Sequence, residues 1–164
     1  MKILVLSDSH SSLHFMRRCI TVVKPDAVVH LGDFYDDGKV IAEENPGLIF
    51  HQLPGNCDRF RCPPWQQEVL VYPVCGVKLY MTHGHKHMVK NGIGGLLRDA
   101  RRCGAQAALY GHTHIPDCHQ EPDGLWVLNP GSSGYGSTAG LIETDGEIIT
   151  ACSLLDQQKL EEMK

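Results

Sequence analysis

The stretch KILVLSDSH, residues 2–10, is the part of this sequence that most clearly indicates the fold. It begins with an apolar run that ends at Asp8, and a run of this length is typical of a strand buried on both faces. Residues 12–24 then carry apolar side chains at helical spacing, and Pro25 ends the predicted helix. The stretch therefore predicts a buried strand and a covering helix, with an acidic side chain at the carboxyl end of the strand.

The same order of elements continues downstream. Apolar runs at 27–31 and 48–53 predict two further strands, and a short helix is expected between them over 40–44. Strands that alternate with helices are typical of a parallel sheet covered by helices. In such sheets ligands bind beyond the carboxyl ends of the strands, and polar residues follow each of these runs. The first third of the chain therefore predicts a ligand site at one edge of a parallel sheet.

The rest of the chain is richer in strands. Glycine-containing turns at Asp123-Gly124 and Asp145-Gly146 each predict a hairpin, so we expect this part to be mainly antiparallel. The fold class we predict is α/β, with two mixed β-sheets packed as a sandwich and helices on the outside. The expected strands lie at 66–72, 77–82, 105–110, 115–121, 125–129, 139–144 and 147–153, with helices at 92–103 and 154–164.

The composition is that of an ordinary globular protein, with 42% apolar and 21% charged residues among 164. The net charge of −4 disfavours long nucleic acid as a partner, and no apolar run approaches the roughly 18 residues of a membrane span. Seven cysteines without a CxxC pair indicate thiols in a reducing compartment. We therefore expect a single cytoplasmic domain over residues 1–164 that binds neither membrane nor long nucleic acid.

Potential metal ligands follow the predicted strands. Carboxylate and amide oxygens together with imidazoles suit manganese, iron, zinc or nickel. Two aspartates supply about two negative charges, so two divalent ions would leave a positive surplus that attracts an anionic substrate and a hydroxide. Two such ions form a clamp for attack at phosphorus. The five short signatures are Asp8-Ser9-His10, Gly32-Asp33, Gly55-Asn56-Cys57-Asp58, His83-Gly84-His85 and Gly111-His112-Thr113-His114.

These five signatures, in this order, resemble the calcineurin-like metallophosphoesterases, and the GNCD form resembles their small bacterial and archaeal phosphodiesterase branch. The resemblance covers nearly the whole chain and implies an αββα sandwich. It also implies hydrolysis of a small phosphodiester by a hydroxide that bridges two ions, with manganese first and nickel, iron or zinc as alternatives. By position, Asp8, His10, Asp33 and His114 would hold one ion, and Asn56, His83 and His112 the other, with Asp33 bridging.

One position departs from the family pattern. Many relatives carry histidine where this chain has Cys57, and that histidine pairs with the following acid to protonate the leaving group. Loss of a general acid costs about 10²–10⁴-fold in rate for a poor leaving group, so we expect good leaving groups to be favoured. The catalytic candidates are therefore Asn56, Asp58 and His85, of which His85 is the nearest replacement donor in the sequence.

Other interpretations remain open at this stage. A catalytically silent scaffold of the same fold, like the retromer subunit, is the alternative function, although every expected ligand position is filled here. A homo-oligomer is also compatible with the sequence. Several residues have a structural interpretation beside a functional one. Cys57 is expected to pack, Asn129–Gly134 to position the histidine loop, Asp36-Asp37 to start a helix, Arg59 and Arg61 to be solvated, His85 and His87 to lie near the site or on the surface, and His14, His30, His51 and His119 to be ordinary surface or satisfied core residues.

Overall fold

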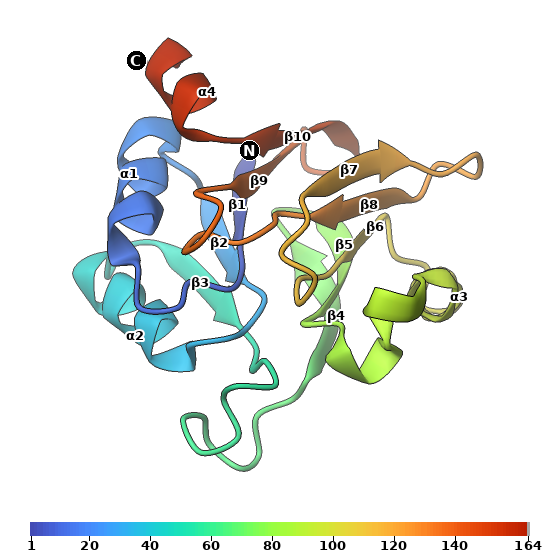
Figure 1. Ribbon diagram of the computed structural model, residues 1–164. Helices are drawn as coiled ribbons and strands as arrows, with labels where there is room; N and C mark the ends of the chain where they lie inside the picture. Colours follow the sequence, from blue (N-terminus) through green and yellow to red (C-terminus); the bar gives the residue numbers. More distant parts are fainter. Residues whose placement is uncertain (164) are drawn as a thin grey trace.

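The computed structural model describes residues 1–163 and shows two five-stranded sheets packed face to face, with α1 and α2 covering one sheet and α3 the other (Figure 1). The predicted fold class is therefore confirmed. The first sheet has the order β10-β9-β1-β2-β3 and the second the order β4-β5-β6-β8-β7. The helices are α1 (Leu13–Val23), α2 (Tyr35–Glu44), α3 (Gly94–Arg102) and α4 (Gln157–Glu162), with 3₁₀ turns η1 (His85–His87) and η2 (Val89–Asn91).

The first sheet contains the predicted parallel core. β1 (Lys2–Leu6) pairs parallel with β2 (Ala27–His30), which pairs parallel with β3 (Ile49–Gln52). The hairpin of β9 (Ala139–Thr144) and β10 (Ile149–Leu155) adds antiparallel strands on the other side of β1. The carboxyl ends of β1, β2 and β3 consequently lie side by side.

The second sheet corrects one prediction, because its centre is parallel. β6 (Ala107–Leu109) runs parallel to both β5 (Val77–Thr82) and β8 (Trp126–Asn129), and only the edge strands β4 (Val69–Val74) and β7 (Asp117–Gln120) are antiparallel. A parallel pair requires a long crossover, which the segment with η1, η2 and α3 provides between β5 and β6. Both predicted hairpins are present: the one at Asp123-Gly124 joins β7 to β8 in this sheet, whereas the one at Asp145-Gly146 joins β9 to β10 in the first sheet.

The helix predicted over 40–44 is longer than expected. α2 begins at Tyr35, and its first turn contains Asp36 and Asp37. Acidic side chains in a first turn interact favourably with the positive end of the helix dipole, which confirms the interpretation of these two aspartates as a helix start. Lys164, the last residue of the predicted C-terminal helix, lies outside the described residues.

The core explains why the first strand is apolar throughout. Ile3 and Val5 point into the cluster between the sheets, whereas Leu4 and Leu6 point into the cluster beneath α1 and α2. Both faces of β1 are therefore buried, and the four side chains have no exposed surface. Among residues 1–163, no helix has the length and apolar character needed to cross a bilayer.

Candidate metal centre

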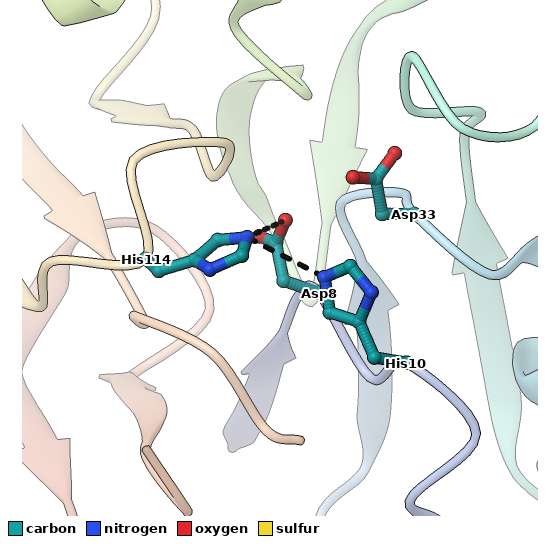
Figure 2. A group of neighbouring side chains, drawn as sticks. All are labelled: Asp8, His10, Asp33 and His114. Atoms are coloured by element: carbon teal, nitrogen blue, oxygen red, sulfur yellow. Dashed lines mark hydrogen bonds and ion pairs between the residues drawn. The ribbon is translucent and has the colours of Figure 1, made fainter. Parts of the chain in front are cut away.

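The loops that follow the parallel strands meet at one end of the sandwich. Asp8 follows β1, Asp33 follows β2, and His114 belongs to the loop after β6 in the other sheet. In Figure 2 the side chains of Asp8, His10 and His114 converge, with Asp33 beside them. One potential ligand atom from each of these four residues lies within 4.8 Å of all the others. The fold thus brings together residues that are more than 100 positions apart.

The contacts inside this group are close. His114 Nε2 lies 3.0 Å from Asp8 Oδ1 and 3.4 Å from His10 Nε2. The Asp8 side chain has no exposed surface, whereas that of His114 is 36% exposed. Two imidazole nitrogens and two carboxylates facing one space form a donor set that suits a divalent transition metal.

Three more of the predicted ligands lie next to this group. His83 Nε2 is 3.1 Å from Asn56 Oδ1 and 3.6 Å from Asp33 Oδ1. The ring of His112 packs against that of His83, with 5.1 Å between the centroids. Asp33 is therefore close both to the first group and to the second, as a bridging ligand would be.

Fixed hydrogen bonds orient two of these side chains. His83 is fully buried, and its Nδ1 lies 2.9 Å from the carbonyl oxygen of Leu31. Because that carbonyl can only accept, Nδ1 carries the proton and the lone pair of Nε2 faces Asn56 and Asp33. The backbone amide of Cys57 donates to Asp33 Oδ1 over 2.9 Å, which fixes the carboxylate.

Asp8 supplies an independent test of whether a cation fits. Its Oδ2 accepts from the Ser7 hydroxyl at 2.5 Å and from the His112 amide at 3.2 Å. Its Oδ1 is buried and makes no hydrogen bond within residues 1–163, although His114 Nε2 lies 3.0 Å away. A buried carboxylate oxygen without a hydrogen bond is costly unless a positive charge faces it, so the donor set fits a cation.

Backbone strain is concentrated at the same residues. Five of the seven predicted ligands have φ between 46° and 67°, a left-handed conformation that non-glycine residues rarely adopt. Such conformations cost on the order of 1–3 kcal/mol each and persist where the surrounding structure fixes them, which is common at functional sites. None of the five sequence motifs indicates this strain. The five residues are Asp8, His10, Asp33, His112 and His114.

The electrostatic environment favours the forms that bind metal. Burial opposes ionisation of Asp33, but His83 and the backbone amide of Cys57 outweigh it, so the pKa of this carboxyl is lowered. Burial, followed by the electrostatic effect of the neighbouring His83, lowers the pKa of His112 to about 4. At neutral pH Asp33 is therefore a carboxylate and His112 a neutral imidazole, the forms in which both residues bind metals.

The catalytic candidates have different surroundings. Asp58 is fully buried, and its two oxygens accept from the backbone amides of Tyr35 and Gly55, each at 2.8 Å. Through these two hydrogen bonds the carboxylate connects the loop after β3 to the start of α2. His85 is half-buried, and its ring centroid lies 5.5 Å from that of His83. It lines a cavity of about 410 Å³ together with Asn56.

Two sequence interpretations are wrong. Cys57 does not pack in the core but is exposed. His30 is fully buried, yet its Nε2 has no hydrogen-bond partner among the described residues, so it is not a satisfied core histidine.

Supporting residues complete the site. The segment from Asn129 to Gly134 positions the histidine loop as expected, because the Asn129 side-chain amide donates to Gly111 O and Thr113 Oγ1. The Ser132 hydroxyl donates to the carbonyl oxygen of Asp8 over 2.7 Å. Phe34 and Tyr135 flank the His10 ring at centroid distances of 4.9 and 4.6 Å. The sequence reasoning missed these two aromatic residues, because neither belongs to a motif.

Comparison with known proteins agrees with this geometry. A family model described as the calcineurin-like phosphoesterase superfamily domain matches residues 1–146. Phosphodiesterase MJ0936 of Methanocaldococcus jannaschii is 29% identical, over 88% of this chain and 94% of its own length. Among solved structures, a predicted phosphoesterase from Streptococcus pneumoniae TIGR4 is 25% identical with a TM-score of 0.73, over 96% of this chain and 90% of that one. Vps29 from Entamoeba histolytica, solved with zinc, has a TM-score of 0.72 at 22% identity, over 95% of this chain and 99% of that one.

Proposed function

The chain belongs to the calcineurin-like phosphoesterase superfamily, and on this premise we propose that it hydrolyses small phosphodiesters at a site for two divalent transition-metal ions. Membership makes it a metal-dependent phosphoric ester hydrolase. The observation that carries the finer proposal is the position of Asp33, whose carboxylate is close both to His83 and to the cluster of Asp8, His10 and His114. One carboxylate between two donor groups is what a pair of ions requires.

The assignment of ligands follows the two groups. We assign Asp8, His10, Asp33 and His114 to one ion, and Asn56, His83 and His112, with Asp33 shared, to the other. When bound, the ions would lower the pKa of water to supply the nucleophile and would neutralise charge on the phosphoryl oxygens. Manganese is the metal we propose, with nickel, iron or zinc as alternatives, because oxygen and imidazole donors suit all of them.

Residues of the chain other than the metal ligands position the loops of the site and the substrate. We assign Asp58 a positioning role, because both of its oxygens are occupied by backbone amides and the residue is fully buried. The cavity lined by Asn56 and His85 supports the proposal that the leaving group binds there. Burial and the neighbouring His83 lower the pKa of His85, so this imidazole is mostly neutral at pH 7 and little of it carries a proton to donate. We therefore propose that good leaving groups are preferred.

We propose one domain over residues 1–164 and a cytoplasmic location, with small phosphodiesters rather than long nucleic acid as substrates. The acidic net charge of −4 supports the last point, because attraction to a polyphosphate backbone requires a basic surface.

The test is hydrolysis of a chromogenic phosphodiester by purified protein supplied with manganese or nickel. Activity should be abolished by a chelator and restored by added metal. Asp33→Asn and His83→Ala should each lose at least 100-fold in kcat/KM, whereas His14→Ala, which changes an exposed histidine on α1, should retain it. Full hydrolysis by both site variants would refute the ligand assignment.

The fold likeness to Vps29 supports a second candidate function, a catalytically silent scaffold that binds a protein partner. The two candidates differ in turnover when metal is bound. Metal content is measured on the same sample that is assayed against monoesters, linear diesters and cyclic nucleotides. Two bound ions without hydrolysis of any substrate would favour the scaffold, and hydrolysis that depends on Asp33 would exclude it.

A further inference from the structure

Two cysteines on different sheets are in contact at one edge of the sandwich. Both are far along the chain from the loop that holds Asp8 and His10. The sulfur of Cys118 on β7 lies 3.2 Å from the sulfur of Cys152 on β10, although 34 positions separate them. β7 is the edge strand of the second sheet and β10 the edge strand of the first. The two strands share no ladder, so this contact joins the sheets through side chains alone.

The strand register explains why the two thiols face each other. Cys152 is paired with Ile142 on β9, and Cys118 is paired with Leu128 on β8. Residues directly opposite each other in an antiparallel pair point to the same face of a sheet. Ile142 and Leu128 are both buried in the cluster between the sheets, so both cysteines also point inward. Their proximity follows from the packing of the two sheets.

From this geometry we propose that Cys118 and Cys152 are a redox-convertible pair that forms a disulfide between the two sheets. A disulfide needs a separation of about 2.05 Å, so the sulfurs must approach by roughly 1 Å. Edge strands can supply such a shift, because each of the two strands is paired with only one neighbouring strand within the described residues 1–163. Both thiols are partly exposed, which gives a small oxidant access.

The chemistry is thiol–disulfide exchange with a small-molecule disulfide. The hydrogen bond between the two sulfurs lowers the pKa of Cys118 despite partial burial and raises the pKa of Cys152. Cys118 is accordingly the attacking thiolate. It displaces one thiol from the small disulfide, and the sulfur of Cys152 then displaces the second. One small disulfide is reduced to two thiols, while two protein thiols are oxidised to one disulfide.

The experiment treats the reduced full-length protein with oxidised glutathione and then alkylates the remaining thiols. Five of the seven cysteines should be alkylated and one internal disulfide should form, reversibly with dithiothreitol. The linkage is mapped with a protease that cleaves after glutamate. Glu143 and Glu147 lie between the two cysteines, whereas no lysine or arginine does. A linked peptide that joins Cys118 to Cys152 supports the proposal.

A matched variant separates this pair from general thiol oxidation. Cys118→Ser and Cys152→Ala should each abolish the linked peptide, whereas Cys75→Ser should retain it, because Cys75 packs against the same core cluster without a cysteine partner. Oxidation should raise the Tm of the unsubstituted protein on the order of 5–10 °C and leave the Cys118 variant unchanged. Alkylation of all seven thiols after oxidation, or linkage through other cysteines, would overturn the proposal. This outcome is independent of phosphoesterase activity.

Discussion

The side-chain nitrogen of Asn129 lies 2.9 Å from the hydroxyl oxygen of Thr113, which stands between the two predicted ligands His112 and His114. The same nitrogen donates to the carbonyl oxygen of Gly111 over 3.2 Å. Asn129 is fully buried at the end of β8, so the core of the second sheet determines where the histidine loop lies. Two histidines on one loop are thereby held toward the loops of the first sheet.

Replacing Asn129 by alanine should loosen this loop. The loss of three hydrogen bonds, two to the histidine loop and one from the Gly131 amide, should lower the free energy of unfolding by about 1–3 kcal/mol and weaken manganese binding by about 10–100-fold. Urea unfolding and calorimetric titration measure the two effects. Asn45→Ala is the control, because the Asn45 side chain donates to the Ile41 carbonyl at the end of α2, and its loss should leave metal affinity unchanged. Equal metal affinity in both variants would contradict the role assigned to Asn129.

Gly111→Ala should disturb the site by steric contact. A Cβ at this position would overlap the Ser7 hydroxyl and lie 2.8 Å from Oδ2 of Asp8. We expect a loss of hydrolysis of 10-fold or more, because the Asp8 carboxylate must move. Gly95→Ala is the matched control, since its Cβ would meet nothing within 4 Å and alanine favours the helix there. If both alanine variants hydrolysed the substrate equally well, Asp8 would not be constrained by this contact.

Cys57→His should restore the proton donor that the family pattern places at this position. Cys57 is exposed, and its backbone amide bonds Asp33, so a larger side chain can be accommodated without loss of that contact. We expect kcat/KM for a phosphodiester with a poor leaving group to rise about 10-fold or more, and little change for a good leaving group. Cys57→Ala serves as the control. A similar gain for both leaving groups would show that the effect is not proton donation.

The pKa values of two histidines outside the site should be shifted in opposite directions. Burial lowers the pKa of His51, and the hydrogen bond to Asp117 raises that of His119. The unfolded chain protonates at a pKa near 6.5, so His51 makes the folded protein less stable as the pH falls below that value. The stabilisation from His119 is complete below 6.5 and is lost as the pH rises through its higher folded pKa.

An NMR titration of the imidazole signals checks both directions. Asp117→Asn should lower the pKa of His119 and leave that of His51 unchanged, because Asp117 contacts only the former. A value above 6.5 for His51, or no response of His119 to the variant, would contradict the assignment.

Local patterns were sufficient for the three parallel strands of the first sheet, but not for the pairing of β9 with β1. The apolar run ending at Asp8 predicted β1 because both faces of that strand are buried, and the run ending near Asp33 predicted β2 in the same way. The run before Asn56 predicted β3, although this strand lies at the edge of the sheet and is only partly buried. The second sheet was predicted less well. The turn at Asp123-Gly124 indicated a hairpin, but nothing local showed that β8 would then pair parallel with β6. Pairing between strands that are distant in the chain depends on how the crossover packs.

The sequence by itself determined which chemical groups are available and which strand ends they follow, because buried strands and tight turns are recorded in local apolar spacing and glycine placement. Only the tertiary structure decided that His114 lies 3.0 Å from Asp8, that Cys57 is exposed, and that Cys118 meets Cys152. These contacts arise from the packing of two sheets and from left-handed backbone at the ligand loops. Such distances depend on the packing of the whole core, which no short stretch of residues specifies.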